Sequence, residues 1–414
     1  MPGPGMELIG DEEIFEVLDV LNGRHLSRYG KDDDPSFKQK VYQLEQQVAS
    51  RSGVSYAVAV NSGTSALLTV LSGLGIGPGD EVIVPGYTFI ASISSIIYAR
   101  AIPVLAEVDR TLNLDPGDVD RKITHRTKAI MVVHMLGNPA RLDALREIAD
   151  RNNLFLIEDC AQAFGATYKG KGIGSYGHAG IFSFNVFKTI TCGDGGMVIT
   201  NNEETYRRCF AFHDQGHSPN RMGVEVGQRQ FLGLDFRMTE LQGAVMLAQI
   251  RKVDAMLVHL RAKKKLYRSL IKDFSDVEFR EITDSEGECA TLLVVFLPTA
   301  KIANDVAHEL GTKVIAKSGW HVYNNMEHLL QQSTVTSEGC PFTCPYYTEH
   351  GGNQAYRKGM LPQTDELLNR AINISIGVVD PGLGAGFGVS INDGPDEVKA
   401  SASKFNQVVS KFLP

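Results

Sequence analysis

The sequence lacks the features that would place the chain in a membrane or in an oxidising compartment. No apolar run approaches the length of a membrane span, and the first residues have neither the charged stretch nor the apolar core of a signal peptide. The six cysteines are scattered through 414 residues, which favours reduced thiols over a disulfide framework. We therefore expect a cytoplasmic protein without a membrane partner.

The charge balance and the cysteine spacing exclude two further classes of ligand. The chain has 41 Lys and Arg residues against 48 Asp and Glu residues, a net charge of −7, and no basic block long enough to follow a phosphate backbone. Cys340 and Cys344 have histidines nearby, but their spacing matches no common zinc pattern. We expect neither a nucleic acid nor a bound metal ion.

Short apolar segments alternate with amphipathic helical patterns in the first part of the chain. Strands are expected at 56–60, 81–84, 103–108, 129–134 and 154–159, and helices at 65–73, 91–99 and 142–152. This alternation is typical of a mostly parallel sheet with helices on both faces. The predicted fold class is therefore α/β.

The segments around this alternation predict an arm and a second domain. Helical spacing at 11–21 is followed by a polar loop or arm over 22–36 and by another helix over 37–52. A long helical pattern at 239–270 precedes two expected strands, 277–282 and 291–296, and a helix at 302–310. We assign residues 1–255 to the N-terminal arm and large domain, and residues 256–414 to a small C-terminal α+β domain.

Lys188 is a lone cation between two apolar runs of the segment 180–200, with a glycine cluster behind it. A lysine in apolar surroundings loses solvation, and the resulting fall in its pKa makes the amine a nucleophile for carbonyl compounds, above all pyridoxal 5′-phosphate (PLP). The glycines permit a sharp turn and a close approach of the backbone to a cofactor. The alternative is an ordinary surface-loop lysine between two strands.

Two strand ends carry further candidates, because ligands of open α/β sheets bind at the carboxyl ends of the strands. The first strand leads into Ser62, Gly63 and Thr64 at a helix start, where free backbone amides and the helix dipole suit a phosphate. An ordinary helix cap would explain the same residues. The strand at 154–159 ends in Asp159, whose carboxylate could keep a pyridine nitrogen protonated or could cap a helix.

These segments together resemble one family. The sequence is similar to the DegT/DnrJ/StrS sugar aminotransferases, PLP enzymes of fold type I, in order and spacing over about residues 10–250. The matching segments are Asn61-Ser-Gly-Thr-Ser-Ala66, Asp80-Glu-Val-Ile-Val-Pro85, Tyr87-Thr-Phe89, Glu158-Asp-Cys-Ala-Gln-Ala163, Phe182-Ser-Phe184 with Lys188, Gly193-Asp-Gly-Gly196 and Gly233-Leu-Asp-Phe-Arg-Met238. The resemblance implies a mostly parallel sheet of the seven-stranded type in the large domain.

The resemblance also implies roles for individual residues. Lys188 would form the Schiff base and then move the proton between the substrate carbon and the cofactor, and Asp159 would bind the pyridinium nitrogen. Phe89 would stack on the ring, and Gln162 would reach the phenolic oxygen or the face of the ring. The phosphate would be held by Ser62, Gly63, Thr64 and Ser183.

Asp235 departs from the family pattern. Asparagine usually occupies this place and reaches across a homodimer interface to the partner subunit's PLP phosphate. Like charges about 4 Å apart repel by roughly 4 kcal/mol at an effective dielectric constant near 20. Asp235 is therefore turned away toward Arg237 or a lysine, or protonated, or the phosphate is held by other donors; a cap for the helix near Thr239 is a further explanation. A homodimer with active sites at the subunit interface is still expected.

The implied reaction transfers an amino group from glutamate or glutamine to a keto sugar in two ping-pong half-reactions. The acceptor could be nucleotide-linked, free, or a cyclitol ketone, and the sequence is most similar to the branch that aminates an eight-carbon sugar acid to 8-amino-3,8-dideoxy-manno-octulosonate. Candidates for the sugar pocket are His217, Trp320, His321, Tyr323, Asn324 and Asn325.

Two other functions are compatible with the same fold. In a PLP-dependent sugar dehydratase histidine typically replaces the lysine, so Lys188 counts against that function. A non-catalytic regulator would not need Lys188, Asp159 and Ser183 together.

Overall fold

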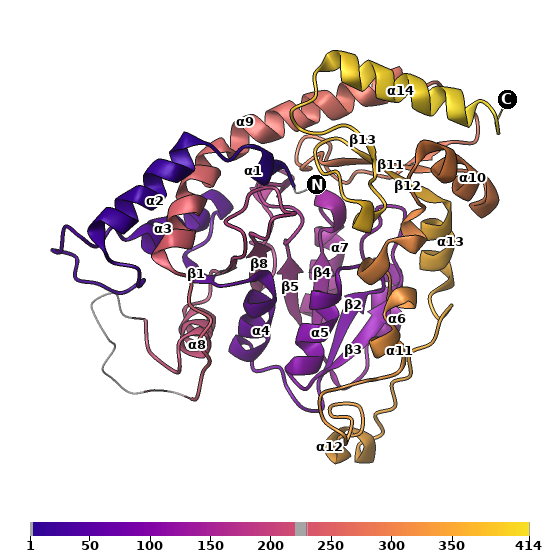
Figure 1. The fold of residues 1–414 in the computed structure, drawn as a ribbon. Coiled ribbons are helices and arrows are strands. Elements are labelled where there is room, and N and C mark those ends of the chain that lie inside the picture. Colours follow the sequence, from indigo (N-terminus) through magenta and orange to yellow (C-terminus); the bar gives the residue numbers. More distant parts are fainter. Residues whose placement is uncertain (1–2, 220–228, 230, 414) are drawn as a thin grey trace.

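The computed structural model describes residues 3–219, 229 and 231–413, and Figure 1 shows the elements in space. The larger sheet has seven strands in the order β1-β9-β8-β5-β4-β2-β3. Their bounds are β1 Tyr56–Val60, β2 Glu81–Pro85, β3 Ile102–Ala106, β4 Thr127–Val133, β5 Phe155–Asp159, β8 Ala179–Ser183 and β9 Gly196–Thr200. Only β9 runs antiparallel to its neighbours, β1 and β8. The predicted mostly parallel sheet is confirmed.

Helices cover both faces of this sheet because its strands are apolar on both faces. On one face, Val58 and Val60 of β1 pack in a core with α4 (Gly63–Gly73), α5 (Ile90–Tyr98) and α8 (Glu203–His213). On the other face, Ala57 and Ala59 pack with α3 (Lys40–Ser52), α7 (Leu142–Arg151) and α9 (Glu240–Leu270). Alternate residues of one strand thus serve two separate cores.

The N-terminal segments follow the predictions closely. Helix α2 spans Asp11–Gly23 and packs along α9, after the short α1 at Pro4–Glu7. Helix α3 begins at Lys40, three residues later than expected, because Gln39 before it adopts a left-handed backbone with φ 55°. The polar segment between α2 and α3 has no regular helix or strand.

The C-terminal part contains a four-stranded sheet in the order β10-β11-β12-β13. Its strands are β10 Glu278–Phe279, β11 Leu292–Phe296, β12 Ala371–Ser375 and β13 Phe387–Gly388, and its main helices are α10 Ala300–Leu310, α13 Pro362–Arg370 and α14 Pro395–Val409. Strand β10 is shorter than the six residues expected there. The remaining short elements are α6 Pro116–Lys122, α11 Glu327–Leu330, α12 Pro345–Glu349, β6 Thr167–Tyr168, β7 Lys171–Gly172 and the 3₁₀ turns at Met135–Gly137, Ile315–Lys317, Gly319–His321, Tyr323–Asn325 and Pro381–Leu383.

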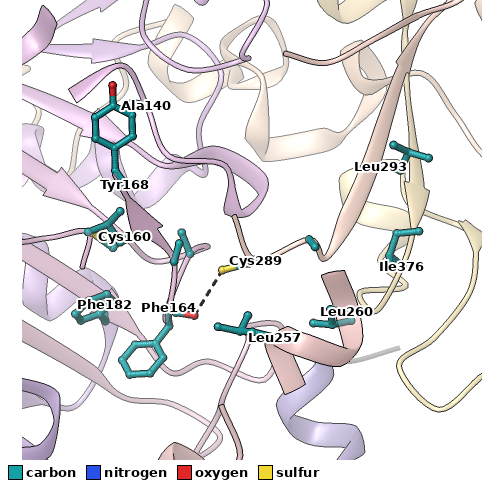
Figure 2. Close-up of a cluster of buried hydrophobic side chains, with 14 of the residues drawn as sticks. Ala140, Cys160, Phe164, Tyr168, Phe182, Leu257, Leu260, Cys289, Leu293 and Ile376 are labelled. Carbon is teal, nitrogen blue, oxygen red and sulfur yellow. Dashed lines mark hydrogen bonds between the residues drawn. The ribbon is translucent and has the colours of Figure 1, made fainter. Parts of the chain in front are cut away.

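Helix α9 joins the two sheets through a shared apolar core. Figure 2 shows Leu257 and Leu260 of this helix between Phe182 of β8 on one side and Leu293 and Ile376 on the other. All five side chains are buried. Because α9 contributes to both parts, a domain boundary inside this helix remains a prediction.

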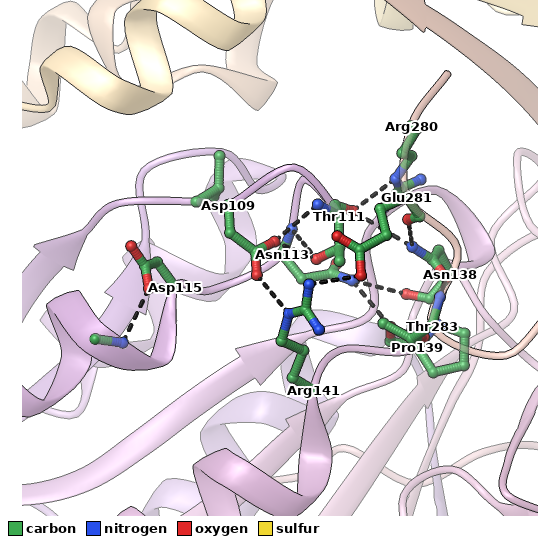
Figure 3. Close-up of polar contacts among 12 residues, drawn as sticks. Asp109, Thr111, Asn113, Asp115, Asn138, Pro139, Arg141, Arg280, Glu281 and Thr283 are labelled. Atoms are coloured by element: carbon green, nitrogen blue, oxygen red, sulfur yellow. Dashed lines mark hydrogen bonds and ion pairs between the residues drawn. The ribbon is translucent and has the colours of Figure 1, made fainter. Parts of the chain in front are cut away.

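Polar contacts fix the second sheet against the end of the first (Figure 3). Arg280, which follows β10, is buried and donates to the carbonyl oxygens of Thr111 and Met135, at 2.6 and 2.7 Å. Arg141 forms ion pairs with both Asp109 and Glu281, at 2.9 and 2.6 Å. The C-terminal part is thereby held next to the carboxyl end of β4. Among the residues described, no helix is both apolar enough and long enough to cross a membrane.

Candidate active site

A cavity of about 430 Å³ lies at the carboxyl ends of β1, β4, β5 and β8. Most of the predicted cofactor residues line it: Ser62, Gly63, Thr64, Phe89, Asp159, Gln162, Ser183 and Lys188. The C-terminal part closes the cavity with Thr291, Leu292, Trp320, His321, Val378, Asp380 and Leu383. Its 321–323 segment is fixed there because Thr88 N–H donates to His321 O and Tyr323 N–H donates to Gly86 O, both at 3.0 Å.

Lys188 lies in the cavity after β8, and its Nζ is 5.9 Å from the centre of the Phe89 ring. Within the part of the chain that the structure describes, its amine has no hydrogen bond and no ion pair. Burial lowers the pKa of Lys188, and the charges of Asp159 and Asp380 oppose that shift only in part. This lysine is therefore not the surface-loop cation of the alternative interpretation.

Asp159 ends β5 and points its carboxylate into a buried environment, with 3% of the residue exposed. Its Oδ1 accepts a hydrogen bond from Ala161 N–H at 3.0 Å, and its Oδ2 accepts one from the Ser92 hydroxyl at 2.8 Å. Burial raises the pKa of Asp159, while Ser92, Ala161 and Lys188 lower it. A turn follows Asp159, so it caps no helix.

Ser62 caps helix α4, and it also lines the cavity together with Gly63, Thr64 and Ser183. We call these four residues the cup. Ser62 Oγ accepts from Ser65 N–H at 3.0 Å, as an N-cap does. No described residue accepts a hydrogen bond from the N–H groups of Gly63 and Thr64. A side-chain carbon built on Gly63 would lie 2.6 Å from Ser183 Cβ, so α4 and the end of β8 meet here at glycine-only distance.

The two predicted ring contacts, Phe89 and Gln162, both line the cavity. Phe89 precedes α5, is 39% exposed, and packs against His321 with ring centres 5.2 Å apart. Gln162 uses its Oε1 to accept from Leu136 N–H at 2.9 Å. No described residue accepts a hydrogen bond from its amide nitrogen, which is therefore available to a ligand.

Asp235 does not line this cavity. It forms an ion pair with Arg237 at 2.6 Å, and Arg237 also pairs with the buried Asp214. The helix cap before α9 is Thr239, whose side chain accepts from Gln242 N–H, so the expectation that Asp235 caps this helix is wrong. The expectation that it turns toward Arg237 agrees with this ion pair.

Of the six candidates for the sugar pocket, the structure brings two to the cavity, Trp320 and His321. Burial lowers the pKa of His321 to about 4, so its imidazole is neutral at pH 7. The others serve structural contacts: Tyr323 and Asn324 bind Asp365, Asn325 donates to Ala316 O, and His217 lies beside Asp214.

Sequence reasoning did not assign several polar residues that line the site, among them Asp380, Asp194 and Ser92. Asp380 and Asp194 line the cavity, and Ser92 binds Asp159. Asp380 lies more than 190 residues beyond Lys188, with no pattern around it that indicates a site. The position of Ser92, three residues after Phe89 on the same helix turn, was the one available signal.

One buried group has the composition of a metal site: His134, Glu158 and Cys160. The lone pairs of the first two are already engaged, because His134 Nδ1 accepts from Ala140 N–H and the Glu158 carboxylate accepts from three backbone amides, those of Gly174, Tyr176 and Gly177. His134 Nε2 lies 3.1 Å from Glu158. This hydrogen bonding explains the cluster without a metal ion.

The donor set of the cavity fits PLP. The free amides of Gly63 and Thr64 at the start of α4 suit a phosphate, and an added side chain on Gly63 would fill that space. A buried carboxylate and an amine with a lowered pKa stand in the same cavity, as pyridine and aldehyde chemistry requires. Phe89 supplies an apolar ring surface in the same cavity, 5.9 Å from Lys188 Nζ.

Comparison with known proteins agrees with the geometry. The model of the DegT/DnrJ/EryC1/StrS aminotransferase family matches residues 8–378. GDP-perosamine synthase of Escherichia coli O157:H7 is 37% identical over 66% of this chain and 74% of its own length. L-glutamine:2-deoxy-scyllo-inosose aminotransferase of Streptoalloteichus tenebrarius is 42% identical over 54% of this chain and 55% of its own. The crystal structure of 3-amino-5-hydroxybenzoic acid synthase superposes with a TM-score of 0.78 at 26% identity and covers 99% of both chains.

Proposed function

This chain belongs to the DegT/DnrJ/EryC1/StrS family of PLP-dependent aminotransferases, and we propose that it moves an amino group from glutamate or glutamine to a keto sugar or a sugar-derived ketone. The observation that carries the proposal is the Lys188 amine, which no described residue binds, in one cavity with the buried Asp159 carboxylate and the cup at the start of α4. We also propose that the chain acts in the cytoplasm.

Lys188 is assigned two tasks at its Nζ. It would hold the cofactor covalently through the aldehyde carbon, and as a free amine it would move the proton between the substrate carbon and the C4′ carbon of the cofactor. The burial that lowers the pKa of Lys188 supports both tasks, because a neutral amine is the reactive form. PLP, when bound, supplies an electron sink for the carbon that loses the proton.

Asp159 is assigned to the pyridinium nitrogen. Its two oxygens each accept one hydrogen bond from the protein, so each keeps a further lone pair for an N–H donor. A carboxylate that stays ionised holds the ring nitrogen protonated. Phe89 and Gln162 are assigned to the ring, and Ser62, Gly63, Thr64 and Ser183 to the phosphate.

The identity of the acceptor is a finer proposal. The two curated relatives described above are named for a nucleotide-sugar product and for a cyclitol substrate. We propose a polyhydroxylated ketone, with the eight-carbon sugar acid as the first member to test and a nucleotide-linked keto sugar or a cyclitol ketone as alternatives. Trp320 and His321 are assigned to the acceptor, because they are the two residues of the predicted sugar pocket that line the cavity.

We further propose that the chain works as a homodimer. Four apolar side chains of α2, at helical spacing, are exposed: Ile14 53%, Phe15 66%, Leu18 46% and Leu21 47%. We call them the α2 stripe. The other side of α2 packs on α9. An exposed apolar stripe of this kind is typical of a protein interface, and the family resemblance favours a second copy of the chain as the occupant.

Spectroscopy tests the reaction. The purified protein with PLP should be yellow, and addition of glutamate or glutamine should remove the visible absorbance. Return of that absorbance on adding single keto sugars then identifies the acceptor, beginning with the eight-carbon sugar acid. A protein that takes up no PLP would exclude the aminotransferase and the dehydratase, whereas uptake without any response to amino donors would exclude the aminotransferase alone.

Sedimentation tests the assembly. At micromolar concentration the wild type should be a dimer, and Phe15→Asp in the α2 stripe should shift it toward a monomer. Val258→Asp is the matched control, because Val258 is 66% exposed but lies on α9 outside the stripe. A fully active wild-type monomer would reject the shared site.

A further inference from the structure

Two buried hydroxyl groups form a short hydrogen-bonded chain that ends at the Asp159 carboxylate. Ser92 Oγ lies 2.8 Å from Asp159 Oδ2, and Thr88 Oγ1 lies 2.7 Å from Ser92 Oγ. Ser92 and Thr88 are each 1% exposed, and Asp159 is 3% exposed. Water therefore does not compete for these hydrogen bonds, and the two hydroxyls are the carboxylate's immediate polar surroundings on that side.

The Asp159 carboxylate at the end of this hydrogen-bonded chain determines which hydroxyl donates each hydrogen bond. An ionised carboxylate only accepts, so Ser92 donates its proton to Asp159. Thr88 is then the donor to Ser92 at 2.7 Å, the shorter of its two contacts, since its other acceptor, Phe89 O, lies 3.4 Å away. Donation from Thr88 leaves the Ser92 oxygen more negative and its proton more available to the carboxylate. The other Asp159 oxygen is fixed independently by Ala161 N–H.

Ser92 differs from the other serines of helix α5. Ser94 and Ser95 donate to carbonyl oxygens three residues earlier, those of Ala91 and Ser92, at 3.4 and 3.1 Å. Such local bonding is what a serine inside a helix ordinarily does. Ser92 instead donates across to strand β5, 67 residues away in the sequence.

We propose that Ser92, supported by Thr88, is a positioning residue that keeps the Asp159 carboxylate ionised and aimed at the ring nitrogen of PLP. The inference rests on the proposed role of Asp159. A hydrogen bond to the charged form of a buried acid favours that form, which opposes the effect of burial. Helix α5 would thereby link two contacts to the same ring, because Phe89 at its start is assigned to the ring face and Ser92 on its first turn holds the carboxylate assigned to the ring nitrogen.

The affinity of the apoprotein for PLP tests this inference without any turnover. Trp320 is the single tryptophan of the chain and lines the cavity, so quenching of its fluorescence reports PLP binding directly. Ser92→Ala should raise the dissociation constant of PLP about tenfold, the scale of a hydrogen bond to a charged group. Ser95→Ala is the matched control: it deletes a fully buried hydroxyl one turn away that does not touch Asp159, and the affinity should stay within about twofold.

A double-mutant cycle separates positioning from a general loss of packing. In an Asp159→Ala background, adding Ser92→Ala should change the PLP affinity by less than about twofold, because Ser92 acts through the carboxylate. Ser92→Thr, which keeps the hydroxyl, should restore most of the affinity. Thr88→Val should lower the PLP affinity less than Ser92→Ala does, because Thr88 contacts Asp159 only through Ser92. It is the substitute test if the Ser92→Ala protein folds poorly.

The outcomes distinguish this inference from the function on which it rests. Wild-type protein that does not bind PLP would reject the proposed function, and an Asp159→Ala variant with wild-type affinity would reject the role of Asp159. If Asp159→Ala weakens binding while Ser92→Ala does not, or if the effects of the two substitutions simply add, Ser92 is not a positioning residue.

Discussion

A methyl group added at Gly63 would test the cup at the start of helix α4. In Gly63→Ala the new carbon would lie 2.6 Å from Ser183 Cβ and 2.9 Å from Ser183 Oγ. Ordinary contact between carbon atoms is about 3.5–4.0 Å, so α4 and the end of β8 must separate by roughly 1 Å. Both elements carry groups assigned to the phosphate, and we therefore expect the substitution to impair cofactor binding.

The size of the effect follows from the cost of overpacking. One extra carbon in a tight site costs about 1–3 kcal/mol. If this strain is expressed in the bound state, the dissociation constant of PLP should rise by about 5- to 150-fold. The free energy of unfolding should fall less, because alanine is the better helix former at the first residue of α4.

Fluorescence titration of the apoprotein with PLP measures the affinity, and urea unfolding measures the stability. Gly77→Ala is the matched control, because its new carbon would meet only Ala99 O at 3.8 Å, an ordinary contact. A folded Gly63→Ala protein with PLP affinity within twofold of wild type would refute the assignment of the phosphate to this cup.

Three further predictions concern single side chains. Lys188→Ala should still take up PLP through the remaining contacts but should lose turnover by several orders of magnitude, since general acid–base catalysis alone contributes about 10²–10⁴-fold; activity within tenfold of wild type would exclude the assigned role. Asp235→Asn should leave PLP affinity unchanged or tighten it, and a clear loss in the titration would show that the carboxylate makes a necessary contact. Burial and the neighbouring Arg28 lower the pKa of His213 to about 3, so the unfolded chain binds this proton first, and stability should fall as the pH drops from about 6.5 toward 3. Thermal unfolding across that range should show a flatter loss for His213→Gln.

Much of the fold could be predicted because the strands are short, apolar and separated by clear helical patterns. The strand at Tyr56–Val60 and the helix from Leu142 are found where periodicity places them. The hairpin of β6 and β7 and the two-residue strand β13 could not be predicted, because pairings of two residues leave no periodicity, and for the same reason the strand predicted at 277–282 is longer than β10. Their positions depend on tertiary contacts such as those of Arg280.

The site residues that lie next to a predicted strand could be predicted from the sequence, whereas those that reach the cavity from the C-terminal part could be predicted only in part. Ser62–Thr64 follow β1 and Asp159 ends β5, so the parallel direction of these strands alone brings them to one edge of the sheet. His321 and Asp380 reach the cavity from the C-terminal part, over a path that includes the pairing of Gly86 with Tyr323. The spacing of residues in the sequence does not predict such tertiary contacts. For this reason, only two of the six candidates for the sugar pocket line the cavity.

The charges of the cavity connect its chemistry to the proposed assembly. Among the described residues that line it, three are aspartates (Asp159, Asp194 and Asp380) and the cations are limited to Lys188, because His321 is neutral at pH 7. The start of α4 adds about half a positive charge. A phosphate and the carboxylate of an amino donor bring more negative charge than these groups balance, and Asp235 is already engaged with Arg237. If both anions bind, further positive charge is needed from outside this lining, and under the homodimer proposal a second copy of the chain across the α2 stripe supplies it. Phe15→Asp should therefore weaken PLP binding and dimerisation together, although Phe15 is not part of the cavity lining.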